Sequence, residues 1–367
     1  MDTLTRTYLA LALTPGLGPR KIKLLTEHFG DAEAVYAASE RELRAVPGLG
    51  PKLVASLLEA KRSERPEGEL ERAARLGATL IHLAHPDYPE ALRSIYDPPP
   101  VLFVKGELPQ ALRGELSEIR SVAIVGTRDA SDYALGLSHR LAQGLAQAGV
   151  TVVSGLARGV DAAAHRGALS VPSGQTVAVL GSGVDTIYPR ENGGLGRAIL
   201  AGRGALVSEY PVGTGPRPEH FPARNRIISG LARAVLVVEG THKSGSMITA
   251  SLALEEGRTV FAVPGRAGDP KAGGTLDLLK QGAVLTQDAD DILSELGWSA
   301  AKESSGPPLS DAERELVTLI RAQDSPLLDD LIAASGQSAT ALLPLLTVLE
   351  LKGAVKAVPG GRYISLR

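Results

Sequence analysis

The sequence predicts an α/β fold: a Rossmann-like, mostly parallel sheet with a helical domain before it and a winged helix after it. Two observations predict the sheet. Short aliphatic runs recur through the middle of the chain, at residues 122–125, 150–153, 177–180, 235–238 and 260–263. Continuous apolar runs are typical of parallel strands that are covered on both faces. Helical stretches separate several of these runs, which favours right-handed βαβ units.

Residues 1–65 form the predicted helical domain, which contains an internal repeat. The sequence Pro-Gly-Leu-Gly-Pro occurs at 15–19 and again at 47–51, each time directly before a helix start. The duplication resembles a SAM-like helix-hairpin-helix repeat, in which glycine hairpins turn backbone amides toward a DNA phosphate. It is equally compatible with two ordinary helix-turn-helix corners.

Composition sets the remaining boundaries. Residues 66–117 form a connector with an accessory edge strand at 101–104, and 118–297 form the Rossmann-like domain. A Ser-, Gly- and Pro-containing linker follows at 298–308. Residues 309–367 predict three helices and a hairpin, which is the order of elements in a winged helix.

Several classes of protein are excluded by composition. The chain has no cysteine, which excludes thiolate metal sites, disulfides and a cysteine nucleophile. No apolar stretch reaches the ~18–20 residues of a membrane helix, and the N-terminus lacks a signal-peptide pattern. We therefore expect a cytoplasmic protein without membrane contact. A net charge of −2 means that nucleic-acid binding would need a local basic patch.

Glycine-containing segments follow most of the predicted strands. Because the carboxyl ends of parallel strands meet at one sheet edge, these segments should line a ligand-binding edge. Glycine-turn amides attract anions, and the planar arginine fork suits phosphate oxygens. A further glycine turn, 264–266, ends the series. The predicted phosphate-binding residues here are Gly126, Arg128, Ser154, Gly155, Arg158, Gly159, Gly181, Ser182, Gly183, Lys243, Ser244, Gly245 and Ser246.

The most basic local run of the sheet domain lies at 217–226. It holds three arginines, a histidine and an aromatic ring against a single carboxylate, Glu219. A base stacked on the ring beside arginine-bound phosphates is typical of single-strand binding. The run adds Arg217, Phe221, Arg224, Asn225 and Arg226 to the predicted site. Alternatively, Phe221 belongs to the core and Asn225 caps a helix.

Acidic neighbours offer other roles for these residues. Arg128 could pair with a nearby aspartate, and Arg158 with Asp161. Asp161 could cap the helix that follows it. It also lies four residues before His165, on the same helix face, but no third metal ligand accompanies the pair.

Motifs for catalysis are absent from the sequence. It contains no dinucleotide-binding glycine pattern, Walker loop, nucleophile elbow or zinc-protease motif. We therefore predict no catalytic residue, metal or cofactor, and a protein that is not an enzyme. Two alternatives stay open. One is a Rossmann-like nucleotide or nucleoside-phosphate hydrolase with Glu209 or Glu239 as base, and the other is a duplex-junction binder led by residues 1–65.

Four ordered motifs resemble the DprA/Smf family of DNA-processing proteins, and the similarity covers most of the chain. They lie at 154–161, 181–189, 221–230 and 244–250. The resemblance implies a homodimeric protein that binds single-stranded DNA, protects it, and loads RecA recombinase during natural transformation. Departures are Leu276-Asp277, where the family usually has Asn after Gly-Thr, and Met247, where Leu is commoner.

Two surfaces are predicted to contact protein. Leu276, Leu279 and Leu285 form an apolar set beside the last strand of the sheet domain, and we predict that they lie in a homodimer interface. The expected recognition helix of the winged helix, 339–352, has one basic residue, Lys352. Duplex binding requires more cations than this, so the helix suits a protein contact or packing on its own chain.

Overall fold

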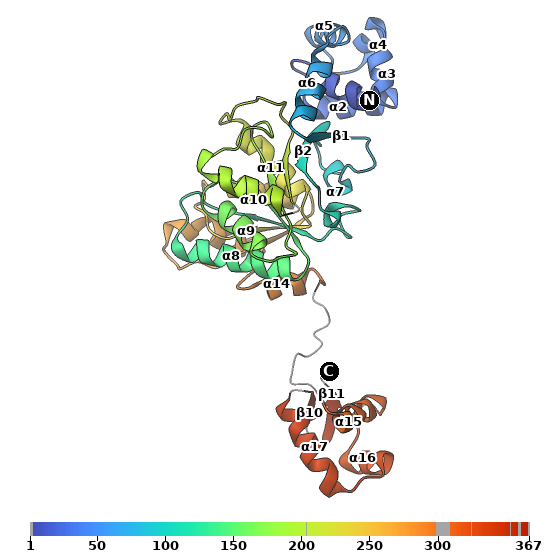
Figure 1. Cartoon of the computed structure of the whole chain (residues 1–367), viewed down its shortest axis with the longest axis vertical. Helices are drawn as coiled ribbons and strands as arrows, with labels where there is room; N and C mark the ends of the chain where they lie inside the picture. Colours follow the sequence, from blue (N-terminus) through green and yellow to red (C-terminus); the bar gives the residue numbers. More distant parts are fainter. Residues whose placement is uncertain are drawn as a thin grey trace. The chain divides into compact units, whose positions relative to one another are not determined.

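A computed structural model describes residues 3–202, 204–298, 309–323, 325–352, 354–358 and 361–365. The chain divides into two compact units, Met1–Glu295 and Leu296–Arg367 (Figure 1). The predicted linker, 298–308, lies outside the described residues except for Trp298.

Nine strands of the described residues form one sheet in the first unit, which confirms the predicted fold class. The strands β3 to β9 pair with one another in parallel. The strands β1 and β2 are antiparallel to their neighbours. In sheet order the strands are β1 (Ala78–His82), β2 (Val101–Gly106), β6 (Ala205–Ser208), β5 (Thr176–Val179), β4 (Thr151–Ser154), β3 (Ser121–Val125), β7 (Ala234–Val237), β8 (Thr259–Ala262) and β9 (Val284–Leu285).

Helices cover both faces of this sheet. Alternation along β5 shows the two faces: Ala178 joins a cluster with Ile199 of α10, whereas Val177 joins the larger core with Ile227 of α11. The helices of this part are α8 (Asp132–Gln147), α9 (Val160–Leu169), α10 (Gly193–Ala201), α11 (His220–Gly230), α12 (Gly245–Glu255), α13 (Gly273–Lys280) and α14 (Ala289–Glu295), with 3₁₀ turns at Arg190–Asn192 and Pro270–Ala272.

The order of the strands reverses between β3 and β7. From β3 the chain steps through β4 and β5 to β6, and then returns past β3 to β7, β8 and β9. The loops after β3 and β7 therefore diverge at the carboxyl edge, where open α/β sheets bind ligands. They stay joined by one backbone hydrogen bond, from Thr127 N to Glu239 O at 2.8 Å.

The helical N-terminal region shares its core with the antiparallel end of the sheet. Leu9, Leu25 and Leu57 belong to the same buried cluster as Phe103 of β2. The repeat is confirmed as a local structure, because Gly16 and Gly48 both have φ near +80° before matching helices. Its helices are α1 (Thr3–Ala12), α2 (Pro19–Phe29), α3 (Ala32–Ala37), α4 (Glu40–Ala45), α5 (Pro51–Ala60) and α6 (Arg65–Arg75).

The connector contains more regular structure than the sequence predicts. Besides α7 (Glu90–Arg93) and a 3₁₀ turn at Gln110–Leu112, it supplies both β1 and β2. The expected edge strand, 101–104, is β2 and is not at the edge, because β1 pairs along its outer side. The polar residues of β1, Thr79 and His82, hide its strand pattern from a hydrophobic-run search.

The second unit has the predicted order of a winged helix. It comprises α15 (Asp311–Ala322), α16 (Leu328–Ser335), α17 (Ala339–Leu351), β10 (Val355–Val358) and β11 (Arg362–Ser365). Leu331, Leu342 and Leu346 lie in its own core. Among the described residues, no single helix is long and apolar enough to cross a bilayer; α16 and α17 pass that test only as a pair bent by 114°.

Candidate nucleic-acid interface

A hollow of about 620 Å³ lies at the β3–β7 switch point. Its wall includes the loop after β3, the start of α11 and the start of α12, together with Ala157 and Asp161 after β4 and Tyr188 after β5. We call it the switch-point hollow. It brings together, from distant parts of the sequence, the predicted residues Gly126, Arg128, Phe221, Arg224, Asn225, Ser244, Gly245 and Ser246.

Arg128 and Phe221 form the exposed centre of this site. The Arg128 guanidinium carbon lies 5.3 Å from the centre of the Phe221 ring, in a cation–π contact. Arg128 has no ion pair among the described residues. Its neighbour Asp129 pairs instead with Lys271 at 3.0 Å. Phe221 is half-buried, so part of its ring packs within the protein and part faces solvent.

Tyr188 belongs to the same surface, although the sequence prediction omitted it. Its ring is tilted against Phe221 with 5.6 Å between the ring centres, and 45% of the residue is exposed. Together with Arg128 and Arg158 the two rings line a small adjoining hollow. The motif at 181–189 already contained this tyrosine, but only the fold brings it to the phenylalanine.

Arg224 lies beneath the floor of the hollow. It is 4% exposed, and its Nη1 donates to the backbone carbonyls of Gly155, at 2.8 Å, and Val179. Burial lowers its pKa to about 10, with the Asp161 carboxylate opposing that shift. The group is therefore cationic at neutral pH. It joins the ends of β4 and β5 and adds positive potential to the hollow.

Asp161 and His165 have separate structural roles. The Asp161 carboxylate accepts from the amides of Gly155 and Ala157, at 3.1 and 3.4 Å, and burial raises its pKa. His165 Nδ1 lies 2.7 Å from Thr176 Oγ1, and burial lowers the pKa of the imidazole to about 3. In the part of the chain that the structure describes, no group of three potential ligands could hold a metal.

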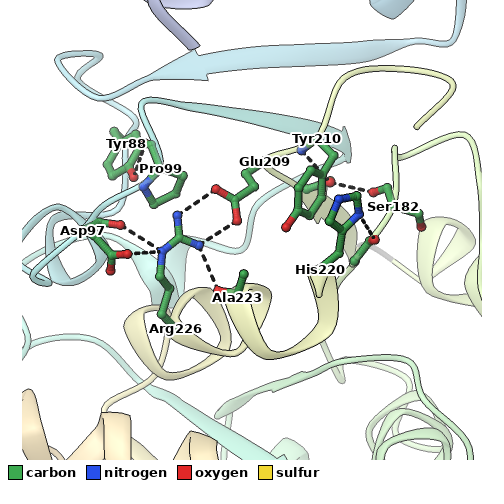
Figure 2. A network of polar contacts seen from close by, with 11 residues as sticks. Tyr88, Asp97, Pro99, Ser182, Glu209, Tyr210, His220, Ala223 and Arg226 are labelled. Carbon is green, nitrogen blue, oxygen red and sulfur yellow. Dashed lines mark hydrogen bonds and ion pairs between the residues drawn. The ribbon is translucent and has the colours of Figure 1, made fainter. Parts of the chain in front are cut away.

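Arg226 points away from the hollow into a buried ion-pair network (Figure 2). Its two terminal nitrogens donate to the two carboxylate oxygens of Glu209 at 2.7 Å, and Nε lies 3.1 Å from an Asp97 carboxylate oxygen. The residue is 6% exposed. The predicted DNA contact of Arg226 is therefore corrected: the guanidinium holds α11 against the sheet.

Other predicted polar groups are also engaged inside the protein. The Ser154 and Ser182 hydroxyls donate to the carbonyls of Ile124 and Thr186. The Gly155 amide donates to Asp161, as described above, and the Gly183 amide donates to Thr214 O at 2.9 Å. All four groups are buried and hydrogen-bonded within the protein, which corrects their predicted role as direct phosphate contacts.

Two glycines permit a close approach of the loops. Gly159 has φ +72°, and a Cβ there would lie 2.3 Å from Thr127 O. At Gly181 a Cβ would lie 2.9 Å from the Phe221 ring. Both distances are too short for a side chain, so these glycines allow the loops after β4 and β5 to pack against the site.

The remaining predicted cations are not part of the lining of the switch-point hollow: Arg158 lines the small adjoining hollow, Lys243 lines a separate one, and Arg217 comes directly before Pro218 of the wall. Arg158 makes a bidentate, exposed ion pair with Glu191, at 2.7 and 3.0 Å. Arg217, before α11, and Lys243, before α12, are exposed and have no ion pair among the described residues. Asn225 lies inside α11 and donates to Gly245 O at 3.2 Å, so it joins two helices and does not cap one.

The three predicted interface leucines lie on α13 and β9, at the far edge of the sheet. Leu285 is 51% exposed, whereas Leu279 is half-buried against the core. Leu276 lines a separate hollow of about 560 Å³, beside Lys243. At the departure from the family pattern, an Asp277 carboxylate oxygen lies 2.8 Å from His242 Nδ1.

The fold is an open, mostly parallel α/β sheet with a partly aromatic hollow at its switch point, the place where proteins of this fold class bind ligands. The model of the family described as DNA recombination-mediator protein A matches residues 79–297. A DprA winged-helix model matches 300–361, and a SAM-like helix-hairpin-helix tandem matches 9–63. The chain belongs to the DNA recombination-mediator protein A family, which confirms the resemblance found in the sequence.

Relatives extend over most of the chain. Protein Smf from Synechocystis is 35% identical in an alignment of 391 positions, gaps included, that covers 97% of each chain. The X-ray structure of DNA processing protein A from Streptococcus pneumoniae gives a TM-score of 0.68 at 33% identity, over 80% of this chain and 99% of that one. A Helicobacter pylori DNA processing protein A, described with a single-stranded DNA binding mode, gives 0.52 at 29% identity, over 61% and 97%.

Proposed function

We propose that this chain binds single-stranded DNA in the switch-point hollow. The observation that carries the proposal is the exposed Arg128 guanidinium stacked on Phe221, with Tyr188 beside them. Aromatic rings stack bases without sequence preference, and neighbouring arginines neutralise the phosphates between them. The single-stranded DNA binding described for the Helicobacter pylori relative supports this assignment.

Charges around the hollow favour an extended anion. Arg128, Arg217 and Lys243 carry no ion pair among the described residues, so each can approach a phosphate without breaking a bond. Arg224 adds a fixed charge from below. The net charge of the chain is −2, so binding depends on this local cluster and should weaken steeply with salt.

We further propose that the protein is a recombination mediator and not an enzyme. By its family resemblance it would form a homodimer, protect incoming DNA and load RecA recombinase during natural transformation. Leu276, Leu279 and Leu285 are the proposed dimer contacts, at the β9 edge. A two-fold axis there would double the DNA-binding surface of the assembly.

The hydrolase alternative is disfavoured by the state of its two candidate bases. Both carboxylate oxygens of Glu209 accept from Arg226. Those of Glu239 accept from the backbone amide and hydroxyl of Ser131, at 2.9 and 2.6 Å. Neither carboxylate lines the switch-point hollow, whereas a general base must lie within hydrogen-bond reach of the proton that it abstracts.

A titration tests the proposal directly. Single- and double-stranded oligonucleotides of one sequence are added to the full-length protein at two salt concentrations. The proposal expects tighter binding of the single strand, with affinity falling as salt rises. Tighter binding of the duplex would instead favour the helix-hairpin-helix alternative, in which the N-terminal repeat leads.

A further inference from the structure

A second hollow, of about 580 Å³, lies at the ends of β7 and β8. We call it the β8 hollow. Its wall includes the last glycine turn of the series, Pro264-Gly265-Arg266, which takes no part in the switch-point hollow. The volume falls in the range of pockets that enclose small organic ligands. The other polar residues of its lining are Ser131, Tyr133, Glu239, Asp269 and Thr275.

The two hollows share one loop. Arg128 and Asp129 line the switch-point hollow, and Ser131, two residues further along, lines the β8 hollow. Lys271 Nζ contacts the Asp129 backbone carbonyl at 2.8 Å and its carboxylate at 3.0 Å. The Asp129 carboxylate is thus paired with a cation, which reduces its repulsion of a polyanion that spans the two hollows.

Tyr133 and Arg266 offer an aromatic ring and a cation, the two kinds of group that bind the base and the phosphate of a nucleotide. Tyr133 is 61% exposed, so its ring is available to a flat ligand. The Arg266 side chain is exposed and has no ion pair or side-chain hydrogen bond among the described residues. A stacked base on the tyrosine with its phosphate on the arginine is the usual pairing in single-strand sites.

Two carboxylates in the wall decide which part of the nucleotide enters. Glu239 is 8% exposed and is held by Ser131, with each carboxylate oxygen retaining capacity for a further hydrogen bond. The Asp269 carboxylate accepts from the Lys271 amide at 2.9 Å. Carboxylates repel a phosphate and accept from N–H donors, so a base fits the interior and the phosphate stays at the rim.

We propose that the β8 hollow is a second base-binding subsite for the same DNA strand. It stacks a base on Tyr133 and favours bases that carry an amino group over thymine, through Glu239. The cytosine 4-amino group donates to a carboxylate, whereas thymine has a carbonyl oxygen at the same ring position. This inference rests on the proposed single-strand binding and adds a position and a base preference to it.

Fluorescence anisotropy titrations test the subsite. They use oligo-dC and oligo-dT of about 12 nucleotides, a length within the usual size of single-strand sites. Wild-type protein should bind oligo-dC more tightly. Tyr133→Ala should weaken oligo-dC binding about fivefold or more, since it removes one stacking platform. Tyr133→Phe should restore it, and Glu239→Gln should reduce the preference for oligo-dC. Tyr96→Ala is the matched control, because Tyr96 is 64% exposed and lies outside both hollows.

The outcomes separate this inference from the proposed function. If Arg128→Ala weakens binding while Tyr133→Ala and Arg266→Ala bind like wild type, the β8 hollow is not a subsite and the switch-point site stands. Equal wild-type affinity for the two oligonucleotides overturns the base preference. If wild-type protein binds neither oligonucleotide, the proposed function fails, and this inference fails with it.

Discussion

Arg128 and Arg226 carry the same guanidinium group in opposite surroundings. Arg128 is exposed and touches the Phe221 ring, whereas Arg226 is 6% exposed and bonded to two carboxylates. A phosphate can displace counterions around the first arginine. Removing the second would leave Glu209, whose side chain is largely buried, without its cation, and breaking such a pair is destabilising. Burial and partners therefore decide which arginine is available to a ligand.

We expect Arg128→Ala to weaken single-strand binding and to flatten its salt dependence. Each phosphate contact contributes about 0.7 to the logarithmic salt slope for single strands, so losing one should reduce the slope by roughly that amount. Titration with one oligonucleotide at several salt concentrations measures both effects.

Arg113→Ala is the control for this change, because Arg113 is also an exposed arginine and pairs with Asp87 outside the hollow. It should alter neither affinity nor slope. If the folded Arg128→Ala protein keeps the wild-type affinity and salt slope, then DNA binds at another surface.

His165 makes a pH-dependent contribution to stability. Burial holds its pKa at about 3, against roughly 6.5 in an unfolded chain. Between these values the unfolded state binds the extra proton. The contribution of His165 to the free energy of unfolding is therefore complete above about pH 6.5 and falls as pH drops, by about 1.4 kcal/mol per unit.

A His165→Gln variant should lose less stability than wild type between about pH 6.5 and pH 4.5, since it lacks this proton linkage. Urea unfolding at several pH values gives the comparison. Parallel pH profiles for the two proteins would show that the pKa of His165 is the same in the folded and the unfolded state.

At the scale of elements, long-range bonds between loops position the site. Arg224 of α11 bonds to the ends of β4 and β5, and Asn225 bonds to the start of α12. The Tyr210 and His220 rings stack with 4.0 Å between centres at the start of α11 (Figure 2). These contacts hold Phe221 where Arg128 can reach it.

The β9 edge gives the sharpest test of dimerisation. Leu285→Glu should convert a homodimer to monomers, because it places a charge on an exposed apolar position of an edge strand. Leu279 is less suitable, since it packs against the core and its substitution risks unfolding. Sedimentation velocity reports the assembly state.

Leu254→Glu provides the comparison, because Leu254 is 52% exposed on α12 and away from β9. It should sediment like wild type. A Leu285→Glu protein that remains dimeric would place the interface on another surface.

At the scale of the whole molecule, the head and the tail differ in their independence. The helical head shares one core with β2, so deleting residues 1–65 would expose apolar surface of the sheet. The winged helix forms a compact unit with its own core. Within this unit, Lys352 at the C-terminal end of α17 forms an ion pair with Glu313 at 2.7 Å, so it is not free for phosphate.

Removing residues 305–367 should therefore leave single-strand affinity nearly unchanged. The segment from 307 onward holds 6 basic against 7 acidic residues, too few cations for strong phosphate binding. An oligonucleotide titration of the truncated protein measures this. A loss of tenfold or more, about 1.4 kcal/mol, would show that the tail takes part in DNA binding.

Local patterns were sufficient to predict the fold class and the region of the site. Aliphatic runs, glycine turns and the repeat at 15–19 and 47–51 all act over a few neighbouring residues, so they can be recognised in the sequence. They predicted the parallel sheet, the winged helix and the carboxyl-edge location of Arg128, Phe221 and Ser244.

Only the tertiary structure decided which of the predicted groups remain free. Arg226 meets Asp97 from 129 residues away, and Arg224 turns inward to carbonyls of β4 and β5. Tyr188 joins the site because its loop folds back onto Phe221. A count of charges within a short window cannot detect such partners, because burial and long-range hydrogen bonds determine whether a cation meets a protein carboxylate, a carbonyl or a ligand.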